Sequence, residues 1–105
     1  MTKLDLPWFD PAPPSADDCV IPRLIDRYAA ETPDKVFIRF ETGETWTWAE
    51  TRTKALETAA ALQARGVKPG DIVAAWAPNS AALVRSWFGA NYAGAALAPI
   101  NTSFR

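Results

Sequence analysis

Two short apolar runs, residues 72–77 and 95–100, lie on either side of a helical pattern, and this arrangement restricts the possible folds more than any other feature. Neither run alternates with polar residues, which is typical of strands buried on both faces. The stretch between them opens with a helix cap at Asn79 or Ser80 and closes at Gly94. A strand, a helix and a strand in succession predict a βαβ unit with parallel strands and a right-handed crossover. The expected fold class is therefore α/β.

The helix of this unit is expected to turn one stripe of side chains toward the sheet. The stripe is formed by Leu83, Val84, Trp87, Phe88 and Asn91. We also expect Trp46, Trp48 and Trp76 to be core residues rather than a base-stacking platform, because the chain has no basic patch.

The residues before this unit predict a helix and a β-hairpin. Apolar residues recur at helical spacing from residue 21, and Pro33 ends that helix near residue 31. Residues 36–40 and 45–48 are rich in strand-forming residues and flank a turn at Gly43, which predicts a hairpin. Alternation places Val36, Ile38 and Phe40 on the core face of the first strand.

A second helix is expected to follow the hairpin directly. Thr47 and Glu50 have the spacing of a capping box, in which each side chain accepts the other residue's backbone N–H. The helix should run from about residue 48 to 65, with Lys54 on its exposed face, and end at Gly66. Pro69 and Gly70 then suit the two central positions of a type II turn.

Residues 1–18 are expected to form an extended arm rich in proline and aspartate, because four prolines remove backbone donors and disfavour helical geometry. Trp8 and Phe9 would hold this arm against the body of the protein. A short linear motif for a partner is the alternative. The remaining residues, 19–105, are expected to form the folded α/β part of the chain.

Composition excludes several classes of catalytic centre. The 105 residues contain no histidine and one cysteine, Cys19, so the chain cannot form a Ser-His-Asp triad, a Cys-His pair, a zinc site or an internal disulfide. A net charge of −1 argues against nucleic acid as a partner. We expect no secretory signal, because a run rich in proline and aspartate follows Lys3 in place of an apolar segment. We expect no membrane span, because Arg85, Asn91 and Pro99 interrupt the longest apolar stretch, residues 81–100. The predicted location is the cytoplasm, and Cys19 is expected to be a partly buried, unreactive side chain.

Candidate binding residues follow the two predicted parallel strands. Ligands of open α/β sheets bind beyond the carboxyl ends of the strands, here the loops at residues 78–80 and 99–102, which should lie on the same side. The helix N-terminus at Ser80 offers free amides to an anion, although Asn79 and Ser80 are more simply helix caps. Asn101 and Thr102 either contact a ligand or only end the strand. The glycines match no phosphate-binding pattern, so no phosphate loop is expected.

The order of these segments resembles the amino-terminal part of the adenylate-forming, or AMP-binding, enzyme superfamily, which includes acyl-CoA synthetases and the adenylation domains of peptide synthetases. The similar segments are TPDKVFIRF (32–40), TWTWAE (45–50), GVKPGDIVAAWAPNS (66–80) and GAALAPINTSFR (94–105). They extend over about three quarters of the chain. The final segment resembles acyl-CoA ligases more than the adenylation domains of peptide synthetases.

This resemblance implies an enzyme that uses ATP and Mg²⁺ to convert a carboxylic acid into an acyl-adenylate and then transfers the acyl group to CoA. It implies that Asn101 and Thr102 lie near the CoA tunnel. The phosphate loop and the catalytic lysine of the family have no counterpart in these residues, so no catalytic and no metal-binding residue is assigned.

We therefore expect a piece of a larger α/β domain: a helix, a β-hairpin and a helix, then the βαβ unit. It would belong to an ATP-dependent acyl-CoA ligase of fatty acid metabolism and be inactive alone, with no cofactor of its own. The alternative is a self-standing, non-catalytic interaction module. Because the predicted sheet has only two strands and open edges, we also expect possible self-association through it.

Overall fold

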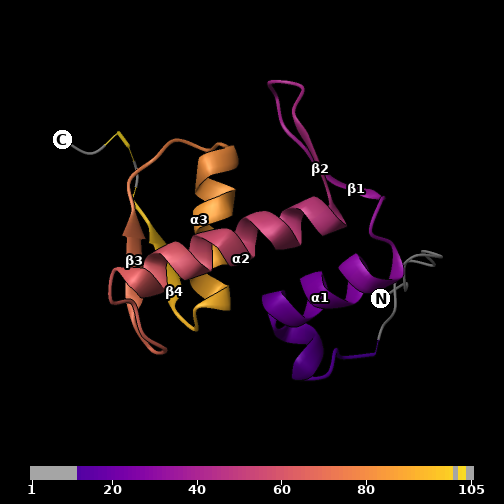
Figure 1. The fold of residues 1–105 in the computed structure, drawn as a ribbon, viewed down its shortest axis with the longest axis horizontal. Helices are drawn as coiled ribbons and strands as arrows, with labels where there is room; N and C mark the ends of the chain where they lie inside the picture. The colour runs from indigo at the N-terminus through magenta and orange to yellow at the C-terminus, as the bar shows by residue number, and fades with distance from the viewer. Residues whose placement is uncertain (1–11, 101, 104–105) are drawn as a thin grey trace, which may run out of the picture.

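The computed structural model describes residues 12–100 and 102–103 and contains three α-helices, one short 3-10 helix and two pairs of strands among them. The elements are η1 (Asp17–Cys19), α1 (Ile21–Glu31), β1 (Val36–Arg39), β2 (Thr45–Thr47), α2 (Trp48–Ala64), β3 (Ile72–Ala75), α3 (Ala81–Tyr92) and β4 (Ala96–Pro99). Figure 1 shows α2 passing in front of α3, with α1 on one side and the pair β3–β4 on the other. The predicted α/β class and order of elements are confirmed.

Local hydrogen bonds explain why the hairpin leads directly into α2. β1 and β2 are antiparallel, with Ile38 opposite Trp46, and Gly43 has the positive φ of +94° that the turn requires. The Thr47 hydroxyl accepts the backbone N–H of Glu50 at 3.1 Å, and the Glu50 carboxylate accepts that of Thr47 at 3.0 Å. The predicted capping box is therefore confirmed.

The βαβ unit also forms as predicted. β3 and β4 are parallel, in a register from Ile72 opposite Ala96 to Ala75 opposite Pro99. Ser80 is the residue that caps α3, since its Oγ accepts the Leu83 backbone N–H at 3.3 Å. The amide of Gly70, in the turn before β3, donates to the Gly94 carbonyl at 2.9 Å, which joins the two ends from which the strands start.

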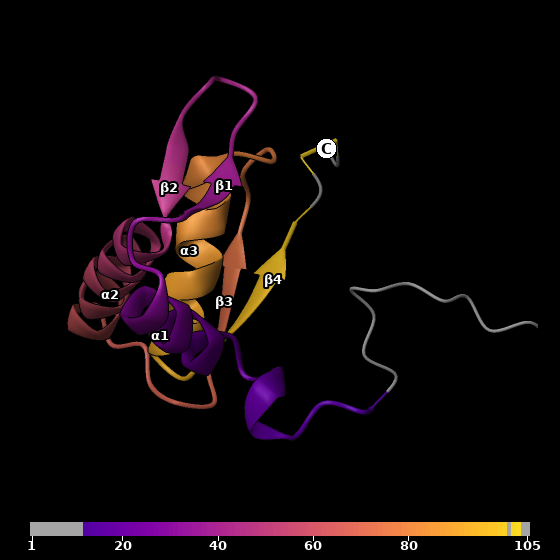
Figure 2. The ribbon, with the colours of Figure 1, turned by 90° about the vertical axis from the view of Figure 1, so that its right-hand side faces the viewer.

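The core lies between the three helices rather than on the sheet. Its buried members are Ile25 of α1, Ala55 of α2 and Phe88 of α3, with the half-buried Trp48 and Tyr92 packed against them. Trp46, also in the core, is 2% exposed. Figure 2 shows α1, α2 and α3 gathered on one side of the molecule, with β4 at the opposite side.

Three expectations about burial are wrong for the described residues. Trp87 is 43% exposed, whereas its neighbour Phe88 is 7% exposed. α3 packs more extensively against α2 than against the strands. The side of α3 that is buried is therefore the one that carries Phe88, and Trp87 lies at its edge. β3 and β4 are also not buried on both faces, since α3 lies on one face and Ala96 is exposed on the other. Ile72 and Trp76 are 74% and 65% exposed there, so the prediction that Trp76 is a core residue is wrong.

Smaller differences concern Lys54, the hairpin and Cys19. Lys54 is half-buried, because its ammonium lies 5.5 Å from the centre of the Trp46 ring. On β1, Val36 is exposed, while Ile38 is half-buried as expected. Cys19 is exposed rather than partly buried.

The described part of the arm, residues 12–18, ends in a 3-10 turn instead of remaining extended. The backbone N–H of Asp18 donates to the Ser15 carbonyl at 3.1 Å, and Asp17 pairs with Arg23 of α1 at 3.1 Å. The predicted contacts of Trp8 and Phe9 lie outside the described residues.

Candidate functional site

A cavity of about 430 Å³ lies at the carboxyl ends of β3 and β4, where the sequence predicts a binding site. It is lined by Ala77, Pro78, Asn79, Leu83, Pro99, Ile100 and Thr102. The lining combines residues from the loop after β3 with residues that follow β4, so the two loops do lie on the same side.

The polar side chains of this lining are those of Asn79 and Thr102. The neighbouring Ser80 is occupied, because its hydroxyl donates to the Pro78 carbonyl at 2.9 Å while accepting the Leu83 amide. This favours the capping role of Ser80 over an anion site. Of the two residues predicted near a ligand, Thr102 lines the cavity, and Asn101 lies outside the described residues.

The seven lining residues carry no titratable group, so their chemistry is limited to hydrogen bonding and apolar contact. An amide and a hydroxyl can orient an uncharged polar ligand, but they supply neither a general base nor a phosphate-binding charge. Among residues 12–100 and 102–103, no group of three or more His, Cys, Asp or Glu is arranged to hold a metal ion. No helix within that same part of the chain is long and apolar enough to cross a membrane.

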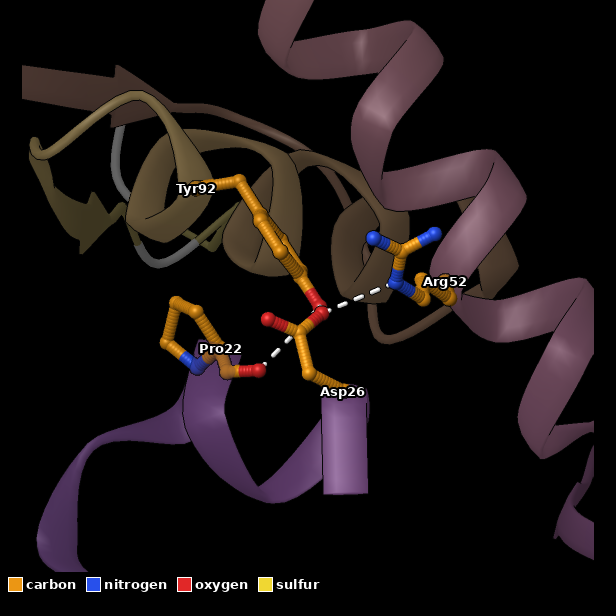
Figure 3. A network of polar contacts seen from close by, with 4 residues as sticks. All are labelled: Pro22, Asp26, Arg52 and Tyr92. Atoms are coloured by element: carbon orange, nitrogen blue, oxygen red, sulfur yellow. Dashed lines mark hydrogen bonds and ion pairs between the residues drawn. The ribbon is translucent and has the colours of Figure 1, made fainter. Parts of the chain in front are cut away.

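A second polar cluster, which no sequence pattern indicates, joins all three helices (Figure 3). The Tyr92 hydroxyl lies 2.6 Å from Asp26 Oδ1 and 3.2 Å from the Pro22 carbonyl oxygen. The Nε of Arg52 donates to the same Asp26 oxygen at 2.9 Å. Asp26 and Tyr92 are 66 positions apart, so no local pattern indicates this cluster.

The cluster changes the titration of its members. Burial raises the pKa of Tyr92 above its ordinary value, and the nearby Asp26 carboxylate raises it further. Burial also raises the pKa of Asp26, but hydrogen bonds from Tyr92 and Arg52 outweigh that effect and hold this pKa below its usual range. The cluster therefore favours a neutral tyrosine beside an ionised aspartate, which is a structural arrangement and not a catalytic one.

We expect the stability of the chain to fall at alkaline pH because of Tyr92. A pKa raised in the folded state means that the stabilisation is fully present below the unfolded value of 10.0 and is lost as the pH rises above it. The free energy of unfolding in urea, measured at pH 8 and again above pH 10, should fall less between the two pH values for Tyr92→Phe than for the parent chain. An equal loss in both proteins would contradict this assignment.

Known proteins are similar to this chain in both sequence and structure. A family model described as AMP-binding enzyme matches residues 25–105. The 3-[(3aS,4S,7aS)-7a-methyl-1,5-dioxo-octahydro-1H-inden-4-yl]propanoyl:CoA ligase of Mycobacterium tuberculosis is 37% identical over 84 residues, which are 80% of this chain and 16% of that protein. CymA of Salinispora arenicola, a probable non-canonical nonribosomal peptide synthetase, is 40% identical over 81 residues, which are 77% of this chain and 1% of that protein.

The solved structure of a Mycobacterium tuberculosis fatty acyl CoA synthetase gives a TM-score of 0.72 at 30% sequence identity. The alignment covers 79% of this chain and 17% of that chain. The chain thus spans a small part of the length of the proteins it matches. These relatives include both CoA ligases and a peptide synthetase, so their names alone do not choose between the two classes.

Proposed function

The chain belongs to the AMP-binding enzyme family, and from this premise we propose that it contributes one wall of the CoA-side cavity of an ATP-dependent acid–thiol ligase. Residues 19–105 would form part of the N-terminal domain of that enzyme. The observation that carries the proposal is the cavity at the ends of β3 and β4, with Thr102 in its lining.

The chemistry of the lining supports a role toward the uncharged part of CoA. The pantetheine arm of CoA is a chain of methylene groups and amides, which suits apolar walls with one amide and one hydroxyl. Leu83 and Ile100 would contact the methylene groups, while Asn79 and Thr102 would hydrogen-bond the amides. Asn101 is proposed as a neighbour of the same arm.

Nucleotide and metal binding are assigned to other parts of such an enzyme. The cavity lining has no cationic side chain to hold phosphates. When bound elsewhere in such an enzyme, ATP with Mg²⁺ would supply the activation of the carboxylic acid as an acyl-adenylate, with pyrophosphate as the leaving group. The CoA thiol would lose its proton to solvent, its sulfur would attack the acyl carbon, and AMP would leave with the electron pair. This chain's residues orient the thiol-bearing arm and perform neither bond change.

The proposed setting is the cytoplasm, with a small-molecule carboxylic acid of fatty acid metabolism and CoA as substrates. We favour a CoA ligase over a peptide synthetase because the final segment of the chain, residues 94–105, resembles CoA ligases more than peptide synthetases. For the isolated chain we propose a second copy of itself as a partner.

A chimeric enzyme tests this function. Residues 25–105 would replace the matching segment of the Mycobacterium tuberculosis CoA ligase, and thioester formation would be followed against ATP and CoA concentration. We expect an active chimera in which Thr102→Ala raises the KM for CoA several-fold and leaves the KM for ATP unchanged. Thr53→Ala makes the same chemical change on the exposed side of α2, and it should alter neither the KM for CoA nor the KM for ATP.

The isolated chain provides the second arm of this experiment. We expect it to show no ATP binding by calorimetry and no pyrophosphate exchange, since catalysis requires residues that it does not contain. Micromolar ATP binding by the isolated chain would contradict the proposal. A folded chimera without activity would instead favour the non-catalytic interaction module.

A further inference from the structure

The two walls of the cavity at the carboxyl ends of β3 and β4 are held in different ways. The wall after β4 is tied to the sheet through the backbone, because the amide of Ile100 donates to the Ala75 carbonyl at 2.8 Å. The wall after β3 belongs to the loop of residues 76–80, which leads into α3 at the end to which both strands point (Figure 2). The register of β3 with β4 ends at Ala75, so the position of this loop depends on other contacts.

One side chain, that of Ser80, holds this loop. Its hydroxyl donates to the Pro78 carbonyl at 2.9 Å, and its oxygen accepts the backbone N–H of Leu83 at 3.3 Å. Pro78 and Leu83 both line the cavity, whereas Ser80 does not. Within residues 12–100 and 102–103, the bond to Pro78 is the only hydrogen bond made by the backbone of residues 76–79. The Ser80 hydroxyl therefore joins the loop to the first turn of α3.

The residue held between these two contacts is Asn79. It is one of the two lining residues with a polar side chain, the other being Thr102. In the part of the chain that the structure describes, the Asn79 side-chain amide makes no hydrogen bond. Its position therefore follows from the position of the loop. Holding a polar group in place before a ligand arrives lowers the entropic cost of binding.

The two hydrogen bonds of Ser80 have different chemical requirements. The bond from the Leu83 amide needs only an acceptor, and it is the cap that stabilises the start of α3. The bond to the Pro78 carbonyl needs an O–H donor, which a helix cap does not require. Aspartate caps a helix as well as serine does, but an ionised carboxylate only accepts hydrogen bonds, whereas threonine both donates and accepts. Substitution by these two residues therefore separates the cap from the loop contact.

We propose that Ser80 is a positioning residue of this cavity, whose hydroxyl fixes the loop before α3 so that the Asn79 amide meets the pantetheine arm of CoA. This role rests on the proposed function, since it takes the pantetheine arm as the ligand of the cavity. Ser80 acts through Pro78 and Asn79 and does not itself touch the ligand. Its effect is expected in the affinity for CoA, and not in nucleotide binding or in the chemical steps.

The chimeric CoA ligase described above tests this role by steady-state kinetics. Ser80→Asp should raise the KM for CoA about 2- to 10-fold, the effect of losing one neutral hydrogen bond, while kcat and the KM for ATP stay unchanged. Ser80→Thr should keep the parent KM for CoA, because it keeps the donor. Ser86→Asp is the matched control. Ser86 also donates to a backbone carbonyl, that of Ala82 at 2.9 Å, but it lies farther along α3 than any lining residue, so neither KM should change.

Two further measurements separate the position of the loop from the new charge and from a weakened helix. Pantetheine has the same arm as CoA without its phosphates, so Ser80→Asp should raise the KM for pantetheine by the same factor. Urea unfolding of the 105-residue chain should give at least the parent midpoint for Ser80→Asp, because the cap is kept. Ser80→Ala loses the cap as well and should unfold at a lower urea concentration.

The remaining outcomes distinguish this role from the proposed function. If Thr102→Ala raises the KM for CoA and Ser80→Asp does not, Ser80 is only a helix cap, and the proposed function stands without the positioning role. If neither substitution changes the KM for CoA, the proposed function fails and the positioning role fails with it. A rise for Ser80→Thr or Ser86→Asp, or a rise with CoA that is absent with pantetheine, would also overturn the positioning role.

Discussion

Phe88→Ala is expected to lower the free energy of unfolding by about 3–5 kcal/mol, as large-to-small changes of buried aromatic residues do. Phe88 is 7% exposed and lies between the three helices, beside Ile25 and Ala55. Its ring centre is 6.3 Å from that of Phe37, so truncation also removes a contact with the hairpin. Truncation of Phe88 would leave a void where α1, α2 and α3 meet.

Trp87→Ala is the matched control, because it truncates the adjacent aromatic residue of the same helix. Trp87 is 43% exposed, so we expect a loss of only about 1–2 kcal/mol. Urea unfolding at low micromolar concentration measures both variants. A larger loss for Trp87→Ala than for Phe88→Ala would show that α3 is rotated relative to the structure.

This pair of residues marks the limit of what the helical pattern predicts. The stripe at Leu83, Val84, Trp87 and Phe88 correctly predicts an amphipathic helix, but it contains two adjacent aromatic residues. The centre of the buried face depends on the neighbouring elements, and the sequence does not show that α2 is the main neighbour of α3. The helical pattern predicts burial of Trp87 only if the sheet is the main neighbour of α3, and that prediction is wrong.

Features that depend on adjacent residues are predicted well. The capping box of Thr47 and Glu50, the positive φ of Gly66 and the Ser80 cap each arise from contacts within a few positions. These features fix where helices begin and end, which explains the agreement for both ends of α2 and for the start of α3. The βαβ unit is also predicted, because the handedness and length of its crossover leave few alternatives.

The candidate site is predicted in its place but not in its composition. The rule for parallel strands correctly indicates the loops after β3 and β4, and Thr102 lines the cavity there. Leu83 was expected to face the sheet, yet it also contributes to the cavity from the first turn of α3. The cluster of Asp26, Arg52 and Tyr92 was missed because its members come from three different helices.

Gly89→Val should destabilise the chain by about 3 kcal/mol, the upper part of the range for overpacked cores. A Cβ atom at Gly89 would lie 2.5 Å from Cγ2 and 2.6 Å from Cβ of Thr58 on α2, so any side chain there forces α2 and α3 apart. Ala82→Val adds the same branched side chain at an exposed position of α3. It should cost less than about 1 kcal/mol, the size of a helix-propensity effect.

Thr58 cannot easily move away from a new side chain at residue 89. Its hydroxyl donates to the Lys54 carbonyl at 2.9 Å and accepts Nε of Arg85 at 2.8 Å, while Arg85 also pairs with Glu57 at 2.9 Å. Rotation of Thr58 would break its hydrogen bond to the Lys54 carbonyl within α2 and its hydrogen bond from Arg85 of α3. The close approach of the two helices therefore depends on glycine at this position, although glycine has low helix propensity.

A double-mutant cycle separates this crowding from any other effect of the substitution. Thr58→Gly removes both of the crowding atoms, so Gly89→Ala should cost at least about 1 kcal/mol less in that background than in the parent chain. Each substitution changes the helix propensity of its own helix by the same amount in both backgrounds, so these contributions to the free energy of unfolding cancel in the cycle. Additive losses in urea unfolding would show that residue 89 does not meet Thr58, and the packing of α2 on α3 would need another explanation.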